Sequence, residues 1–272
     1  MLKDITLGQY FPGKSFIHRL DPRTKILCIV IYITVIFLIK SYLGYAALAV
    51  FTFLCIFSSK IPIKYVLKGL KPIMMFVAIT ALFNLFLTSG RVLWKWGFLT
   101  ITYEGITLAI YMVLRLFFLV LGTSLLTLTT SPIALTDGIE NLLSPLKKIG
   151  VPAHELAMMM TIALRFVPTL LEETDKIIKA QTARGADFES GNLISRAKAM
   201  IPILIPLFIS AFRRADELAV AMECRCYCGG ENRTRLRALK MTYRDAFGFG
   251  AIILFTAAII LTNILSAGLG WL

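Results

Sequence analysis

Long apolar stretches alternate with short polar segments over the first half of the chain and recur near its end. About 20 helical residues cross a bilayer core of about 30 Å. Five stretches approach or reach this length: Ile26–Ile39, Tyr42–Phe57, Pro72–Thr88, Gly105–Leu128 and Phe247–Leu265. The first two are short and only Lys40-Ser41 separates them, so we expect flanking residues to extend both into a tight hairpin. The pattern predicts an all-α polytopic membrane protein with about five transmembrane helices.

The segment between the fourth and fifth spans, residues 131–245, has the periodicity of amphipathic helices instead. Apolar residues at helical spacing predict one long helix over Ala153–Ala183, which Gly185 would end. A second long helix is predicted from near Asn192 to Cys226. At 1.5 Å per residue the first would be about 46 Å long, which exceeds the bilayer core. We therefore predict that these two helices lie along the membrane surface and cross each other.

Basic residues predict the orientation. With an odd number of spans, 25 of the 29 Lys and Arg residues fall on one side of the membrane. Since basic residues accumulate in cytoplasmic loops, the N-terminus is predicted to be cytoplasmic and the C-terminus external. The apolar run Ala199–Phe212 is predicted not to be a sixth span, because Arg213 and Arg225 would then lie outside. The external loop with Trp94 and Trp96 fits an interfacial aromatic belt.

This organisation divides the chain into three parts. Residues 1–130 would hold an N-terminal segment and the first four transmembrane helices, and residues 246–272 the last one. Residues 131–245 would form a cytoplasmic module, and 13 of the 16 acidic residues fall there. Ser131-Pro132 is a typical start for its first, short helix, which should end near Ser144-Pro145.

Composition excludes several classes of protein. The chain has 272 residues, of which 57% are hydrophobic and only 17% charged, which excludes an ordinary soluble domain. The net charge of +13 suggests nucleic acid at first, but the aromatic residues lie mostly within apolar runs, so no base-stacking surface is visible. Five cysteines, an odd number with two in predicted spans, argue against a disulfide framework.

One motif is misleading. Residues 8–15, GQYFPGKS, satisfy the G-x-x-x-x-G-K-S phosphate-loop pattern. That chemistry needs a buried strand before the loop and a helix after it, yet only seven residues precede Gly8, and Pro22 interrupts the segment after the loop. We expect no nucleotide, cofactor or metal to bind to this chain.

Three other features have ordinary interpretations. Cys224, Cys226 and Cys228 are spaced too closely for a typical zinc site. His18 and His154 are expected at the surface, without a catalytic role. Arg115 lies in the middle of the fourth span, where a charge is costly, so it should face protein, a carbonyl or a polar partner such as Asn84. A structural role for Arg115 is favoured over a role in transport.

Two arginines are singled out by repetition. Both long helices are predicted to finish as a small residue, an arginine and another small residue, Ala183-Arg184-Gly185 and Cys224-Arg225-Cys226. One arginine in a last helical turn is ordinary, because it complements the helix dipole. Repeated between small neighbours, the guanidinium could pair with a carboxylate or cap carbonyls of a two-fold partner.

These residues resemble the T component of energy-coupling factor (ECF) transporters over essentially the whole chain. The resemblance is carried by the opening YxPGxSFxHRLDPRTK at residues 10–25, by LLTLTTSP at residues 125–132, and by the two arginine motifs. In this family the second motif more often has alanine before the arginine and glycine or serine after it. The first motif has the usual form.

The resemblance implies a non-catalytic subunit of an ATP-driven importer in the bacterial cell membrane. Each of two homologous ATPase subunits would receive one helix end, with Ala183, Arg184 and Gly185 or Cys224, Arg225 and Cys226 as the contacting residues. These partners, not this chain, would bind ATP. The membrane part and the coupling helices would hold a substrate-binding S component, which releases a vitamin or other micronutrient inside.

Three alternatives remain open. The chain could be a dedicated cobalt or nickel T component, or a mere scaffold for other membrane proteins. It could also be a membrane-embedded enzyme that uses polar residues of the cytoplasmic segment such as Glu172, Glu173 and Asp175. Those acids are interspersed with lysines, as expected of a solvated helix face.

Overall fold

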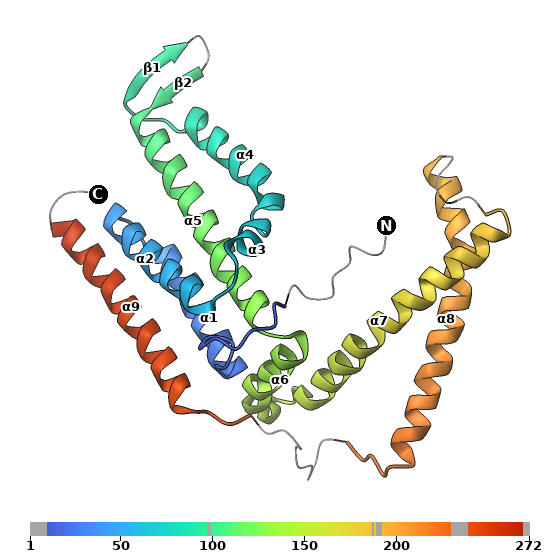
Figure 1. Ribbon diagram of the computed structural model, residues 1–272. Coiled ribbons are helices and arrows are strands. Elements are labelled where there is room, and N and C mark those ends of the chain that lie inside the picture. The colour runs from blue at the N-terminus through green and yellow to red at the C-terminus, as the bar shows by residue number, and fades with distance from the viewer. Residues whose placement is uncertain (1–9, 97–98, 187, 189–191, 230–238, 269–272) are drawn as a thin grey trace. The chain divides into compact units, whose positions relative to one another are not determined.

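The computed structural model describes residues 10–96, 99–186, 188, 192–229 and 239–268 (Figure 1). In this part of the chain nearly all regular structure is helical. The elements in chain order are α1 (Pro22–Leu38), α2 (Tyr42–Ser59), α3 (Ile63–Lys68), α4 (Lys71–Leu87), β1 (Val92–Trp96), β2 (Leu99–Thr102), α5 (Tyr103–Thr129), α6 (Pro132–Leu143), the 3₁₀ helix η2 (Ser144–Ile149), α7 (Ala153–Ala183), α8 (Leu193–Glu223) and α9 (Tyr243–Gly268).

The all-α polytopic fold is confirmed, with two elements that the apolar pattern did not predict. The short helix α3 occupies the polar loop after α2. A hairpin of the antiparallel strands β1 and β2 occupies the predicted external loop, with Val92 opposite Thr102 and Trp96 opposite Leu99. The predicted aromatic belt depends on the side chains of Trp94 and Trp96. The structure describes the backbone of these two residues but not their side chains.

Four of the described helices are long and apolar enough to cross a membrane: α2, α5, α7 and the Tyr243–Ser266 part of α9. Helix α4 is apolar but shorter, and α1 has 17 residues. By length and composition alone α7 therefore qualifies as a span, although we predicted that it lies on the membrane surface. The five-span arrangement stays a prediction.

The described helices fall into two compact units. One unit contains Gly8–Ile139 and Leu239–Leu272, which hold α1 to α5, most of α6, and α9. The other contains Glu140–Ala238, which hold η2, α7 and α8. The boundaries at residues 139 and 238 differ from the division at residues 130 and 245 that we predicted.

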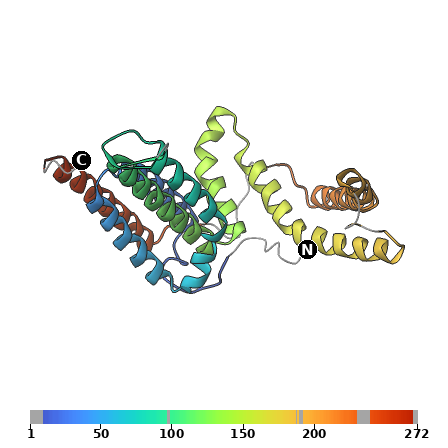
Figure 2. The ribbon, with the colours of Figure 1, turned by 90° about the horizontal axis from the view of Figure 1, so that it is seen from above.

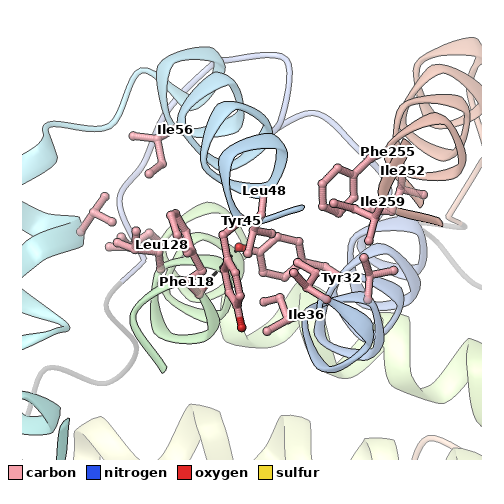
Figure 3. Packing of buried hydrophobic residues seen from close by; sticks show 14 of the residues in the cluster. Tyr32, Ile36, Tyr45, Leu48, Ile56, Phe118, Leu128, Ile252, Phe255 and Ile259 are labelled. Carbon is pink, nitrogen blue, oxygen red and sulfur yellow. Dashed lines mark hydrogen bonds between the residues drawn. The ribbon is translucent and has the colours of Figure 1, made fainter. Parts of the chain in front are cut away.

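Helices α1, α2, α5 and α9 form the core of the first unit, and Figure 2 shows them side by side. Tyr32 lies at its centre (Figure 3), where its hydroxyl bonds to Thr52 Oγ1 at 2.9 Å and donates to the carbonyl of Phe118 at 3.1 Å. A Cβ at Gly122 would overlap the ring of Tyr32. Glycine is therefore required for α5 to approach α1 this closely.

Polar contacts hold the segment before α1 in place. The N–H of Phe11 donates to the carbonyl of Leu128 at 2.9 Å, and Lys25 Nζ donates to that of Thr129 at 2.9 Å. The carboxylate of Asp245 accepts from the N–H of Asp21 at 2.7 Å. The described residues from Phe11 to Lys25 are thus tied to the end of α5 and the start of α9, which are distant in sequence.

Candidate functional site

Helix α7 ends in a regular capping motif that contains Arg184. The N–H of Gly185 donates to the carbonyl of Thr182 at 2.9 Å, and the N–H of Ala186 donates to that of Gln181 at 3.0 Å. These two bonds define a Schellman motif, in which the residue after the cap has a positive φ. Gly185 has that conformation, with φ of 88°. Arg184 is therefore the C-cap residue, the last one in contact with the helix.

Helix α8 ends in the same motif, with Arg225 at the same position. The N–H of Cys226 donates to the carbonyl of Glu223 at 2.8 Å, and the N–H of Tyr227 donates to that of Met222 at 3.1 Å. Cys226 takes the place of Gly185 and has φ of 55°, a conformation that few residues other than glycine adopt. The two arginines, which sequence analysis paired by their neighbours, thus have equivalent backbone surroundings.

Both arginine side chains are exposed, and so are the predicted contact residues beside them, Ala183, Gly185, Cys224 and Cys226. Within the described residues neither guanidinium makes a hydrogen bond or an ion pair. The structure does not bring the two arginines together. Helix α8 runs back from the end of α7, so that the two helices finish at well-separated points (Figure 1).

An ion pair joins the two helices. Arg214 Nη2 in α8 donates to Glu173 Oε2 in α7 at 3.0 Å, and both side chains are partly exposed. Glu173 precedes Arg184 by 11 residues and Arg214 precedes Arg225 by 11 residues. At 1.5 Å per residue each arginine lies about 16 Å along its helix from the pair. The sequence pattern did not indicate this pair, although its separation of 41 residues equals that of the two arginines.

The predicted crossing of the two long helices is visible in Figure 2, where α8 is seen nearly end-on while α7 runs across the view. A shallow apolar hollow of about 340 Å³ lies between them, lined by residues such as Phe166, Leu170 and Leu218. Much of the remaining apolar surface of both helices is exposed in this chain, including Met159 at 56% and Phe208 at 59%. Exposed apolar surface of this extent is typical of contact with a partner or with lipid.

The phosphate-loop pattern does not form a phosphate loop in its described part, which begins at Tyr10. Residues 15–20 form turns, and the first helix begins only at Pro22. The hydroxyl of Ser15, which would bind magnesium in a nucleotide site, is buried and bonded to His18 Nδ1 at 2.7 Å. Gly8 and Gln9 lie outside the described residues.

Both histidines are partly exposed, and each has hydrogen-bond partners that the sequence did not indicate. His18 is half-buried, and its Nε2 bonds to the carbonyl of Phe11 at 3.0 Å while Nδ1 contacts Ser15. His154, at the start of α7, bonds through Nδ1 to Glu140 Oε1 at 3.0 Å. Both histidines make local hydrogen bonds from partly exposed positions. Among the described residues, no three His, Cys, Asp or Glu side chains are grouped so that they could hold a metal ion.

The chain is similar to proteins of a recognised family over most of its length. The CbiQ family, described as "Cobalt transport protein", matches residues 13–236. The energy-coupling factor transporter transmembrane protein EcfT of Ruminiclostridium cellulolyticum is 61% identical over 261 residues, 96% of this chain and 98% of that protein. Proteins of the same name from Clostridium kluyveri and Bacillus subtilis are 64% and 48% identical, and the matches cover 90% and 94% of this chain and 92% and 97% of those proteins.

Proposed function

Because this chain belongs to the CbiQ family and is an EcfT-type transmembrane component of an ECF transporter, we propose that it couples two ATPase subunits to a substrate-binding S component. In this role the chain catalyses nothing itself. ATP binding and hydrolysis by the two homologous partners would move the ends of α7 and α8. The two helices would pass this movement to the S component, which then releases a vitamin or other micronutrient inside the cell.

The observation that carries the proposal is the structural equivalence of Arg184 and Arg225. Each is the C-cap residue of a 31-residue helix with the same hydrogen-bond pattern, and each has an exposed side chain. Two equivalent features suit two homologous partners, one for each helix end. The planar guanidinium can pair bidentately with a carboxylate, and small neighbours such as Ala183 leave space for the partner's backbone.

The exposed apolar faces of α7 and α8 support a contact with the S component. Exposure of these apolar side chains to water is unfavourable, so a membrane surface or an apolar partner should cover them. Unlike the arginine ends, they offer few groups with fixed hydrogen-bond geometry. Such a surface tolerates exchange of one partner for another, as interchangeable S components would require.

The distribution of charge supports a location in the bacterial cell membrane with a cytoplasmic N-terminus. On the five-span arrangement, 25 of the 29 basic residues face the cytoplasm, where the ATPases and their ATP are. Helix α7 then lies along the membrane surface, because its second half carries Glu172, Glu173, Asp175, Lys176 and Lys179. These charges would be costly in the hydrocarbon core.

The contacts of Glu173 give the enzyme alternative less support. Glu173 accepts a hydrogen bond from Arg214, which gives this carboxylate a structural partner on α8. Its neighbour Glu172 is exposed on the same helix. We propose accordingly that this chain binds no cofactor or metal of its own and that its ATP-binding sites belong to its partners.

Purification of the tagged full-length chain from its native membrane in mild detergent tests the proposal. Two ATPases should co-elute in equal amounts with the chain, together with one or more small membrane proteins that bind vitamins. An eluate without ATPases would contradict the proposal. A single cobalt- or nickel-binding membrane partner would instead identify a dedicated metal transporter, the alternative suggested by the family description.

A further inference from the structure

Arg115 lies deep within α5, far from both ends of the helix. It follows Tyr103 by 12 residues and precedes Thr129 by 14 residues, about 18 and 21 Å along the axis. Helix α5 is one of the helices that are long and apolar enough to cross a membrane. Arg115 is therefore near the middle of the bilayer if α5 spans it, at the depth where a charge is most costly.

Within the described residues, Arg115 has no polar partner. Its guanidinium lies over the ring of Phe37 in α1, 5.4 Å from the centroid, and its Nε is buried without a hydrogen bond. Asn84, the partner suggested by the sequence, donates instead to the carbonyl of Thr80 in its own helix at 2.8 Å. An aromatic ring attracts a cation but accepts none of the directed hydrogen bonds that five guanidinium N–H groups can donate.

The arginine itself is partly buried, but the ring beside it is open to the outside of the bundle. Phe37, on which it rests, is 56% exposed, whereas the core residue Phe118 on the same helix as Arg115 is 4% exposed. The partly buried charge thus lies beside an exposed ring at the edge of α1 and α5, where hydrocarbon or another membrane protein covers that ring. In hydrocarbon its donors would remain unsatisfied, which is the situation that membrane proteins avoid.

We propose that Arg115 is a docking site within the membrane for a partner protein, whose transmembrane segment supplies a carboxylate or a free backbone carbonyl at mid-bilayer depth. A lipid phosphate is the poorer fit, because it lies at headgroup level and an arginine side chain cannot bridge about 18 Å. A second copy of this chain would present a second Arg115 and be repelled. Given the proposed function, on which this inference rests, the partner is the S component.

The test uses the full chain co-expressed with the two ATPases and an S component from the same organism. Arg115→Gln removes the charge and keeps a side chain of similar length, while Arg115→Lys keeps the charge. Arg91→Gln is the matched control, because Arg91 is exposed and lies outside the predicted spans. Its hydrogen bond to Glu104 comes from the backbone N–H, so the substitution does not remove the donor. The amounts of S component and of ATPases retained per chain are measured after purification.

Arg115→Gln should reduce the retained S component at least tenfold and leave the ATPases unchanged, since loss of one member of a buried charge-assisted contact is costly. Arg115→Lys should keep most of the S component, and Arg91→Gln should behave as wild type. Retention of the S component by Arg115→Gln would overturn the inference. The inference would also be overturned if Arg115→Gln lost a bound lipid and not the S component. In that case an anionic lipid would co-purify with wild type but not with the variant.

A second measurement decides the matter if Arg115→Gln does not accumulate in the membrane. A photo-crosslinking amino acid placed at Phe37 leaves Arg115 intact. It should form an adduct with a transmembrane segment of the S component close to an acidic residue or a break in its helix, whereas adducts with lipid alone would overturn the inference. A wild-type chain that retains no ATPases would contradict the proposed function, yet this adduct would still establish the docking site.

Discussion

At the scale of single residues, the backbone capping of α7 and α8 leaves the side chains of Arg184 and Arg225 available to bind a partner. A Schellman motif uses backbone groups to satisfy the last carbonyls of the helix. The side chain of the C-cap residue is therefore not needed to cap the helix and is available for contact with a partner. In α7 and α8 this position holds arginine, the side chain best suited to bidentate pairing.

Replacement of both arginines should release the ATPases. In the double variant Arg184→Glu and Arg225→Glu, each contact with a partner carboxylate becomes repulsive, and a contact of this kind commonly contributes about 2–5 kcal/mol. Each single variant should impair uptake. Lysine at either position should support uptake poorly, because an ammonium group lacks the planar, two-pronged geometry of the guanidinium. Co-purification and vitamin uptake in cells are measured. An assembled double variant with normal uptake would mean that these arginines act only on the local helix dipole.

Cys226 offers a test of backbone strain beside Arg225. Its φ of 55° is unfavourable for a residue with a Cβ, whereas Gly185 has the equivalent conformation without cost. Cys226→Gly should therefore stabilise the protein by about 1 kcal/mol, and Gly185→Ala should destabilise it by a similar amount. Thermal unfolding of the purified protein measures both changes. Opposite signs for the two substitutions are the expected result, and a stability loss in Cys226→Gly would refute the explanation.

Lys14 tests the phosphate-loop pattern. Since Ser15 is bonded to His18 and turns follow it, Lys14→Ala should leave ATP binding by the assembled transporter unchanged. Binding of a radiolabelled or fluorescent ATP analogue is measured for the complex and for the isolated chain. Saturable binding to the isolated chain that this substitution abolishes would show that the pattern is functional after all.

At the scale of helices, an ion pair joins α7 and α8 beside the apolar residues that line the hollow between them. Glu173 and Arg214 each precede the arginine at the end of their own helix by 11 residues, and the two helices run in different directions (Figure 1). A change in the angle at which the two helices cross near this pair would displace both arginine ends together. We expect the pair to act through geometry more than through stability, because partly exposed ion pairs contribute only about 0.2–1 kcal/mol.

An exchange of charges tests this role. Arg214→Glu alone places two carboxylates together and should lower uptake, while Glu173→Arg combined with Arg214→Glu should restore most of it. Glu172→Arg is the control, because Glu172 is the exposed neighbour of Glu173. Uptake and the coupling of ATP hydrolysis to transport are compared with thermal stability. If the single variant transports normally, or if the exchange fails to restore what it lost, the pair does not position the helices.

At the scale of the whole molecule, the five-span arrangement makes a topological prediction. Single cysteines introduced near Trp94 or after Leu272 should react with a membrane-impermeant maleimide in intact cells. A cysteine at Arg196 should react only after the membrane is permeabilised, because residues 131–245 are then cytoplasmic. The five native cysteines are first replaced by alanine or serine. Labelling at Arg196 in intact cells would instead favour a membrane crossing by α7, which has the required length.

Much of this architecture is determined by local sequence. Apolar runs of sufficient length specify α5 and α9, because so small a chain cannot bury this many apolar residues away from water without a bilayer. Helix starts and stops follow from residues such as Ser131, whose hydroxyl accepts from the N–H of Ala134, and Gly185, whose φ is positive. The bounds Ala153–Ala183 of α7 agree with the prediction for the same reason.

Tertiary structure decided what depends on partners distant in sequence. Nothing near Glu173 in sequence indicates that it pairs with Arg214 rather than with water, and nothing near Arg115 indicates the ring of Phe37 in place of Asn84. His18 became a structural residue because Phe11 and Ser15 fold back onto it. Local propensity fixes where helices begin and end, but long-range contacts arise only when those helices pack, and their geometry selects which polar groups meet.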